Sequence, residues 1–178
     1  HALNQVQFSL DRTIHLAQQL LSLAKAEPGS LSFQPVDLAA LAQDVVESLV
    51  PCALERQIEI EFDRPDNAVI VDGQAFNLRE MLSNLVDNAL LYTPAGGQVI
   101  VTLQQNPVVR LSVEDTGAGI PVSLKQKVFE RFYRLNPNEG KGSGLGLSIV
   151  QEIAKAHQAT VSIMDGRDGV GTCFTVNF

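Results

Sequence analysis

The segment from residue 78 to 92 carries the first pattern that could support chemistry. Glu80, Asn84 and Asn88 stand four residues apart. In a helix that spacing turns each side chain by only ~40° from the previous one, so the three would share one face. Asparagine inside a helix costs roughly half a kcal/mol or more relative to alanine, so we expect its polar group to be used.

The amide oxygen of asparagine is a hard ligand that suits Mg²⁺. This ion takes few protein ligands and completes its shell with phosphate oxygens and water. Asn84 and Asn88 are therefore candidate ligands for Mg²⁺. Glu80, one turn earlier, would orient or deprotonate a nucleophile near that ion. The alternative interpretation is a solvated polar face without a ligand.

The second pattern is EDTGAGI, residues 114 to 120, at the end of an apolar segment. Gly117 and Gly119 permit a close backbone approach and positive φ angles. The carboxylate of Asp115 can accept hydrogen bonds from an exocyclic amine, so this segment could recognise adenine. The alternative interpretation is a plain turn.

The third pattern is KGSGLGLS, residues 141 to 148, directly before an apolar stretch with helical spacing. Its three glycines would expose backbone amides at a helix N-terminus, where the partial positive charge favours phosphate. The spacing differs from the dinucleotide-binding fingerprint. It also departs from a Walker A loop, because Leu135 replaces the first glycine and Gly142 follows Lys141 in place of Ser or Thr. The sequence therefore argues against both common nucleotide-binding folds.

The composition limits the class of protein that carries these patterns. The chain has 178 residues, 45% of them hydrophobic, and a formal net charge of −7. This suits one ordinary domain with a small appendage and excludes a disordered chain or a disulfide scaffold. The acidic balance argues against a nucleic-acid partner. Cys52 and Cys173 match no metal-ligand spacing and are expected to be reduced and without function.

The sequence contains no segment suited to crossing a membrane. Its apolar runs fall short of the ~18 residues of a membrane span, and its first residues have no signal pattern. We therefore expect a soluble fragment that makes no direct membrane contact.

The elements that must position the three patterns begin with a helix at residues 1 to 26. Its apolar and small residues alternate at spacings of three and four, which is typical of a coiled coil or a helix bundle. Pro28 and Gly29 end it. The exposed-looking connector that follows indicates a separate unit, although a helix packed on its own domain is the alternative.

Beyond the connector, Asp37 can cap a helix that runs to Leu54, and Asp72 is expected to open a second helix to about Leu91. A third helix should follow the glycine-rich segment and end at His157. Strands are predicted at residues 57–63, 68–71, 98–105, 108–115, 159–164 and 172–178. Helices and hairpin-linked strands alternate irregularly, which predicts an α+β chain: a two-layer sandwich of one mixed sheet with helices on one face.

The order of these motifs resembles the ATP-binding domain of bacterial sensor histidine kinases, over essentially the whole chain. NLVDNALLYT looks like the family's N box, DTGAGI its G1 box, VFERFYR its F box, GSGLGL its G2 box and GVGTCF its last glycine box. The resemblance implies the Bergerat ATP-binding fold, with a mostly antiparallel sheet. It also implies a partial dimerisation helix at 1–27, a linker at 28–36 and an ATP-binding catalytic domain at 37–178.

The resemblance further implies the role of individual residues. It implies Mg²⁺ and ATP as cofactors, with Asn84 and Asn88 as metal ligands, and it makes Phe129 and Phe132 anchors of a lid. The residues implied to be catalytic are Glu80, Asn84, Arg134 and Lys141. Those implied to bind ATP are Asn84, Asn88, Tyr92, Asp115, Gly117, Gly119, Ile120, Phe132, Arg134, Lys141, Gly142, Ser143, Gly144, Leu145, Gly146, Leu147 and Thr172.

The chain departs from the family's commonest pattern in three ways. Leu91 stands where a basic residue often precedes the tyrosine, and Thr116 replaces an asparagine. No phosphoacceptor motif is present, because His1, His15 and His157 lack its surroundings and are expected to be surface or packing residues. We therefore predict a fragment that begins inside the second helix of the dimerisation hairpin.

The function predicted is transfer of the ATP γ-phosphoryl group to a histidine outside this fragment, in a two-component sensor. The implied partners are a cognate response regulator, the protein's own phosphoacceptor hairpin and a second copy in a full-length homodimer. The implied location is the cytoplasmic part of a bacterial inner-membrane sensor. Two alternatives stay open: an ATP-driven conformational clamp of the related chaperone, topoisomerase or mismatch-repair type, and a nucleotide-binding module without catalysis.

Overall fold

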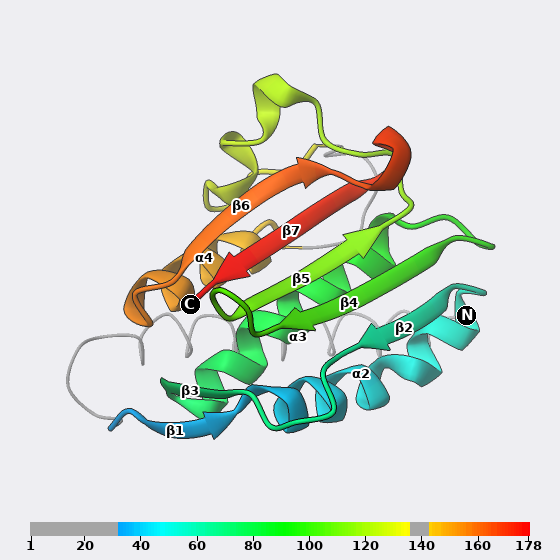
Figure 1. The fold of residues 1–178 in the computed structure, drawn as a ribbon. Coiled ribbons are helices and arrows are strands. Elements are labelled where there is room, and N and C mark those ends of the chain that lie inside the picture. Colours follow the sequence, from blue (N-terminus) through cyan, green and yellow to red (C-terminus); the bar gives the residue numbers. More distant parts are fainter. Residues whose placement is uncertain (1–31, 136–142) are drawn as a thin grey trace, which may run out of the picture.

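The computed structural model describes residues 32–135 and 143–178 (Figure 1). The helix expected at residues 1–26, together with Lys141 and Gly142, lies outside the described residues. The division of the chain at residues 27 and 36 stays a prediction. Within the expected linker, the structure places residues 34–36 in a short strand.

Three helices are described: α2 at Leu38–Glu55, α3 at Ala75–Tyr92 and α4 at Gly146–Ala156. The predicted cap of α2 is confirmed, since Oδ1 of Asp37 accepts hydrogen bonds from the backbone N–H of Ala39 at 3.0 Å and of Ala40 at 3.4 Å. The same oxygen accepts from the N–H of Val69 at 3.3 Å, which ties the start of α2 to the chain before β3.

The predicted start of α3 at Asp72 is wrong by two residues. Asp72 lies in strand β3 (Ile70–Gly73), which pairs with β1 (Gln34–Asp37) in a two-stranded antiparallel sheet. The N-cap of α3 is Gln74, whose backbone N–H donates to Nε2 of His157 at 3.0 Å. Nδ1 of the same imidazole bonds to the carbonyl of Ile153 at 2.8 Å. The expectation that His157 is a packing residue is confirmed, because it joins the end of α4 to the start of α3.

The main sheet has five strands in the order β2-β4-β5-β7-β6. Strands β2 and β4 are parallel, and every other neighbouring pair is antiparallel. This confirms the predicted mixed, mostly antiparallel sheet. The strand bounds are β2 Glu59–Asp63, β4 Gln98–Gln104, β5 Arg110–Asp115, β6 Thr160–Asp165 and β7 Thr172–Asn177.

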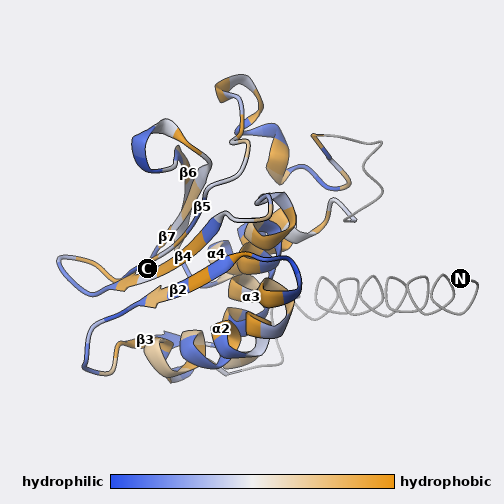
Figure 2. Cartoon of the chain, turned by 90° about the vertical axis from the view of Figure 1, so that its right-hand side faces the viewer, coloured by the Kyte–Doolittle hydropathy of each residue, from blue (hydrophilic) through white to orange (hydrophobic). Residues whose placement is uncertain are grey.

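The three helices cover one face of this sheet, as predicted (Figure 2). Alternation along each strand sends apolar side chains toward the helices. Val99, Val101 and Leu103 of β4 are at most 2% exposed, and they face a helix layer whose Leu82 and Leu85 are fully buried. The core therefore lies between the two layers, and α3 crosses its centre.

Three short 3₁₀ helices complete the described part: Val122–Leu124, Lys127–Phe129 and Arg167–Gly169. Phe129 anchors its segment to the sheet, since its ring packs edge-on against Phe174 with centroids 6.4 Å apart. Phe132 is 68% exposed. Among the described residues, none of the helices has both the length and the apolar character that membrane crossing requires.

Candidate functional site

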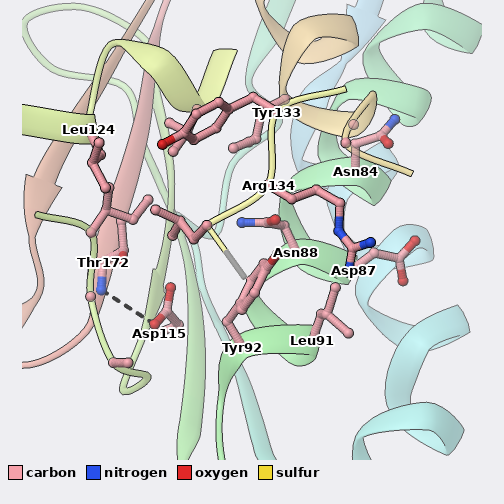
Figure 3. Close-up of a pocket in the computed structure, with 18 of the residues that line it drawn as sticks. Asn84, Asp87, Asn88, Leu91, Tyr92, Asp115, Leu124, Tyr133, Arg134 and Thr172 are labelled. Atoms are coloured by element: carbon pink, nitrogen blue, oxygen red, sulfur yellow. Dashed lines mark hydrogen bonds between the residues drawn. The ribbon is translucent and has the colours of Figure 1, made fainter. Parts of the chain in front are cut away.

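A cavity of about 600 Å³ opens between α3, the end of β5, the start of β7 and the start of α4 (Figure 3). All three sequence patterns contribute to its lining. The residues brought together there from the predicted site are Asn84, Asn88, Tyr92, Asp115, Gly119, Ile120, Arg134, Ser143, Gly144, Gly146, Leu147 and Thr172.

The amide oxygen of Asn84 is available to a ligand in the cavity. Its side chain is only 8% exposed, and Nδ2 donates to the carbonyl of Glu80 at 2.8 Å. That hydrogen bond leaves Oδ1 as the atom available to a ligand. A Cβ on Gly146 would lie 2.9 Å from this oxygen, so glycine is what allows α4 to begin so close to Asn84. Asn88, one turn further along α3, lines the cavity on the same side.

Asp115 is the buried acid of the cavity, with 4% of its surface exposed. Its Oδ1 accepts hydrogen bonds from the backbone N–H of Gly117 at 2.8 Å and of Thr172 at 3.3 Å. These two bonds come from different strand ends and hold the carboxyl group in one orientation. Burial raises the pKa of Asp115 above its ordinary value of 3.8, the two backbone hydrogen bonds lower it, and the charge of Glu114 raises it.

The motif GVGTCF allows the start of β7 to approach the end of β5 closely. Gly171 has φ +74°, and a Cβ there would lie 1.8 Å from the carbonyl oxygen of Asp115. Any larger residue would therefore push the start of β7 away from the end of β5. The hydrogen bond from Thr172 to Asp115 depends on that close approach.

The remaining walls of the cavity are largely apolar and include Tyr92, Ile120 and Leu147. A flat aromatic ligand with an amino group would bury its faces against these walls and direct the amine to Asp115. Arg134 enters from another side and points toward the carboxylate of Asp87 (Figure 3).

Four predicted site residues lie outside the lining. Glu80 is half-buried one turn before Asn84, and Gly117 supports Asp115 from behind through its N–H. Leu145 is 1% exposed in the core and Phe132 is 68% exposed. Lys141 and Gly142 lie outside the described residues.

The structure also adds residues that the sequence patterns missed. Asp87 could have been found, because it lies between the two asparagines on the same helix. Arg56 belongs to none of the three sequence patterns. It follows α2, and only the folded chain brings it to Leu90 of α3. The added lining residues are Arg56, Asp87, Ala118, Pro121, Leu124, Val128, Tyr133 and Leu135. Leu91, noted above as a departure, also lines the cavity.

The described residues contain no group of three or more His, Cys, Asp or Glu side chains that could hold a metal. A cation at Asn84 and Asn88 would thus depend on oxygens brought by a ligand, which matches the coordination habit of Mg²⁺.

Comparison with known proteins defines the class. Residues 73–178 match the family described as histidine kinase-, DNA gyrase B- and HSP90-like ATPase. The chain belongs to this ATPase family, and the predicted resemblance to the ATP-binding domain of sensor histidine kinases is confirmed.

Two relatives of this chain are named as sensor kinases. The chain is 40% identical over 173 residues to the sensor protein kinase PmrB of Pseudomonas aeruginosa, which covers 94% of this chain and 35% of that protein. It is 35% identical over 168 residues to the probable sensor histidine kinase TcrY of Mycobacterium tuberculosis, covering 92% and 35%. The chain therefore spans about a third of the length of these relatives.

Solved structures agree with this assignment. The mycobacterial sensor histidine kinase MprB superposes with a TM-score of 0.70 at 31% identity, covering 82% of this chain and 96% of that one. Full-length ShkA in complex with AMPPNP superposes with a TM-score of 0.81 at 31% identity, covering 95% and 36%.

Proposed function

We propose that this domain binds Mg-ATP and transfers the γ-phosphoryl group to a histidine outside this chain. One observation carries the proposal: a single cavity holds a fixed carboxylate acceptor, Asp115, and a fixed amide oxygen, Asn84, supplied by different elements. The first suits the amino group of adenine, and the second suits a phosphate-bound cation.

Asp115 would recognise the base. Because Oδ1 already accepts two backbone N–H groups, the second oxygen is left to accept from the 6-amino group of adenine. The same oxygen would repel the carbonyl that guanine carries at that position. Ile120 and Leu147 would bury the faces of the ring.

Asn84 and Asn88 would hold Mg²⁺ together with phosphate oxygens. When bound, the ion would neutralise the charge that develops on the transferred phosphoryl group. Gly146 starts α4, and the N-terminus of this helix faces the same cavity, where its partial positive charge favours phosphate.

The remaining predicted catalytic residues would position the reacting groups and neutralise their charge. Glu80, on the turn of α3 before Asn84, would orient the attacking imidazole and take its proton. Arg134 reaches into the cavity from the segment after Phe129 and would approach the phosphates. Lys141 is proposed for the same task from the sequence alone. Such positioning accounts for most of catalysis in phosphoryl transfer.

The names of the relatives support the choice of partners. The similarity to proteins named as sensor kinases supports phosphotransfer rather than an ATP-driven clamp as the function of this chain. Gyrase B and HSP90 belong to the same ATPase family. We therefore propose a response regulator, the protein's own phosphoacceptor hairpin and a second copy of the full-length chain as partners. The domain would work on the cytoplasmic side of a bacterial membrane sensor, where ATP is available.

The test is transfer to a separate hairpin fragment that carries the acceptor histidine. This chain with Mg-ATP should place acid-labile phosphate on the hairpin and none on itself. Glu80→Gln should slow transfer about 100-fold or more while ATP affinity changes little, since a general base acts in the transition state. The exposed Glu55→Gln is the control. Label that accumulates on this chain alone would refute the proposal.

A further inference from the structure

The cavity contains a second arginine that the proposed function does not use. Arg56 follows the last turn of α2, is half-buried and lines the cavity. Its Nη1 donates to the carbonyl of Leu90 at 3.0 Å, across 34 residues of sequence. The last carbonyls of a helix attract cations, so this bond holds the guanidinium against the end of α3.

Arg56 forms no ion pair with a carboxylate of the described residues. The pairs that join Arg79 to Asp44, Lys125 to Asp165 and Arg131 to Glu152 do not include it. A guanidinium has five N–H donors, and the bond to Leu90 uses one of them. A half-buried cation beside a cavity, in a chain of net charge −7, therefore keeps donors for an anion that enters from outside.

The wall around Arg56 offers no substitute for its charge. Among the described lining residues, Arg56 and Arg134 are the two with a permanent positive charge. Arg134 points toward Asp87 (Figure 3), and Leu91, on the α3 side, is apolar. The carbonyl that holds Arg56 belongs to Leu90, which lies between the lining residues Asn88 and Leu91, so the guanidinium lies on the wall of the cavity that α3 forms.

We propose that Arg56 is a nucleotide-binding residue that contacts the polyphosphate of ATP from the α2 side of the cavity. This inference rests on the proposed function. A guanidinium gains most from a phosphate, because two parallel N–H groups can bond two oxygens at once. The bond to Leu90 pre-orients the side chain, so less rotamer entropy is lost when the nucleotide binds.

Calorimetry with ATP and adenosine separates a phosphate contact from a structural one. Arg56→Met should weaken ATP binding about 10- to 100-fold, which is typical of a lost charge-assisted hydrogen bond. Adenosine binding should change less than about twofold, because adenosine carries no phosphate. Arg56→Lys should recover part of the loss. The control is Arg64→Met, an exposed arginine in the loop after β2.

A second variant makes the test independent of the Leu90 hydrogen bond. Leu91→Lys in the Arg56→Met background returns a cation to the same wall and should restore most of the ATP affinity without affecting adenosine. If Arg56→Met unfolds the chain, Arg56→Gln replaces it, since its amide can still donate to the carbonyl without a charge.

The outcomes distinguish this inference from the proposed function. Equal losses for ATP and adenosine, or no loss for either, would overturn the role of Arg56 and leave the proposed function intact. A wild-type chain that binds neither ligand would overturn both. Selective loss of ATP affinity, recovered by Leu91→Lys, supports the inference.

Discussion

At the scale of single residues, the site depends on which atom of each polar group is already used. Nδ2 of Asn84 donates to the carbonyl of Glu80, and Oδ1 of Asp115 accepts from two backbone N–H groups. Each residue is thereby fixed in orientation with one oxygen left over. Both residues line the cavity, so a ligand that enters it can reach these oxygens. These two available acceptors are therefore the most direct sign of a binding function.

Asp115→Asn tests this balance through stability as a function of pH. The pKa of Asp115 is raised in the folded chain, chiefly by burial, so its ionised form opposes folding. That cost is absent below the ordinary value of 3.8 and complete above the raised pKa. The neutral amide avoids the cost while its oxygen can still accept from Gly117 and Thr172. Relative to wild type, the free energy of unfolding of the variant should therefore rise as pH increases through this window.

Urea unfolding of both chains across the acidic range provides the measurement. The same variant should bind ATP about 1 to 3 kcal/mol more weakly at neutral pH, because it loses a charge-assisted hydrogen bond to adenine. Asp66→Asn, an exposed carboxyl group far along the chain from the motif, is the control for the charge change. A parallel pH dependence of wild type and Asp115→Asn would contradict the assignment of the burial cost to this group.

At the scale of elements, the sequence predicted those helix and strand bounds that depend on interactions between neighbouring residues. Alternation located β4 and β5 to within two residues, and the cap at Asp37 located the start of α2, because both depend on neighbouring residues. The start of α3 was missed because it depends on His157, 83 residues away, and on the pairing of β3 with β1.

The candidate site divides in the same way. Asn84, Asn88 and Asp115 could be predicted, since their motifs are contiguous in sequence. Arg56 could not, because only the packing of α2 against α3 brings it to the end of the latter helix. Phe132 was predicted as a site residue because it belongs to the motif VFERFYR, but the structure places it 68% exposed. A sequence motif does not specify which way a side chain points.

Asp37→Ala tests the element that starts the domain. The carboxylate caps α2 and also accepts from Val69, so its removal leaves three backbone N–H groups without this acceptor. We expect a loss of about 1 to 2 kcal/mol in the free energy of unfolding, which is the upper part of the range for N-caps. Asp44→Ala on the same helix is the matched control, because its exposed pair with Arg79 contributes about 1 kcal/mol or less. Equal effects of the two substitutions in thermal unfolding would remove Asp37 as a cap.

At the scale of the whole molecule, the cavity lies at the edge of the core and shares Ile120 and Val128 with it. The core lies between the sheet and the three helices, whereas the cavity lies where α3, β5, β7 and α4 come together at their ends. The net charge of −7 would disfavour a polyphosphate at most of the surface, so binding depends on the local donors of the cavity. A ligand that binds only the folded chain must then stabilise it as a whole.

This coupling gives a prediction for thermal unfolding with and without Mg-ATP. At a ligand concentration 100 times the Kd, binding should add about 2.7 kcal/mol, which raises the Tm of a chain of this size by about 5 to 10 °C. Asp115→Asn at the same ATP concentration should retain only about 0.3 to 1.8 kcal/mol, since a loss of about 1 to 3 kcal/mol in binding raises its Kd about 5- to 150-fold. Asp37→Ala should instead start from a lower Tm and keep the full shift, because the cap does not line the cavity. If Mg-ATP leaves the wild-type Tm unchanged, or shifts Asp115→Asn as much as wild type, the cavity is not the ATP site.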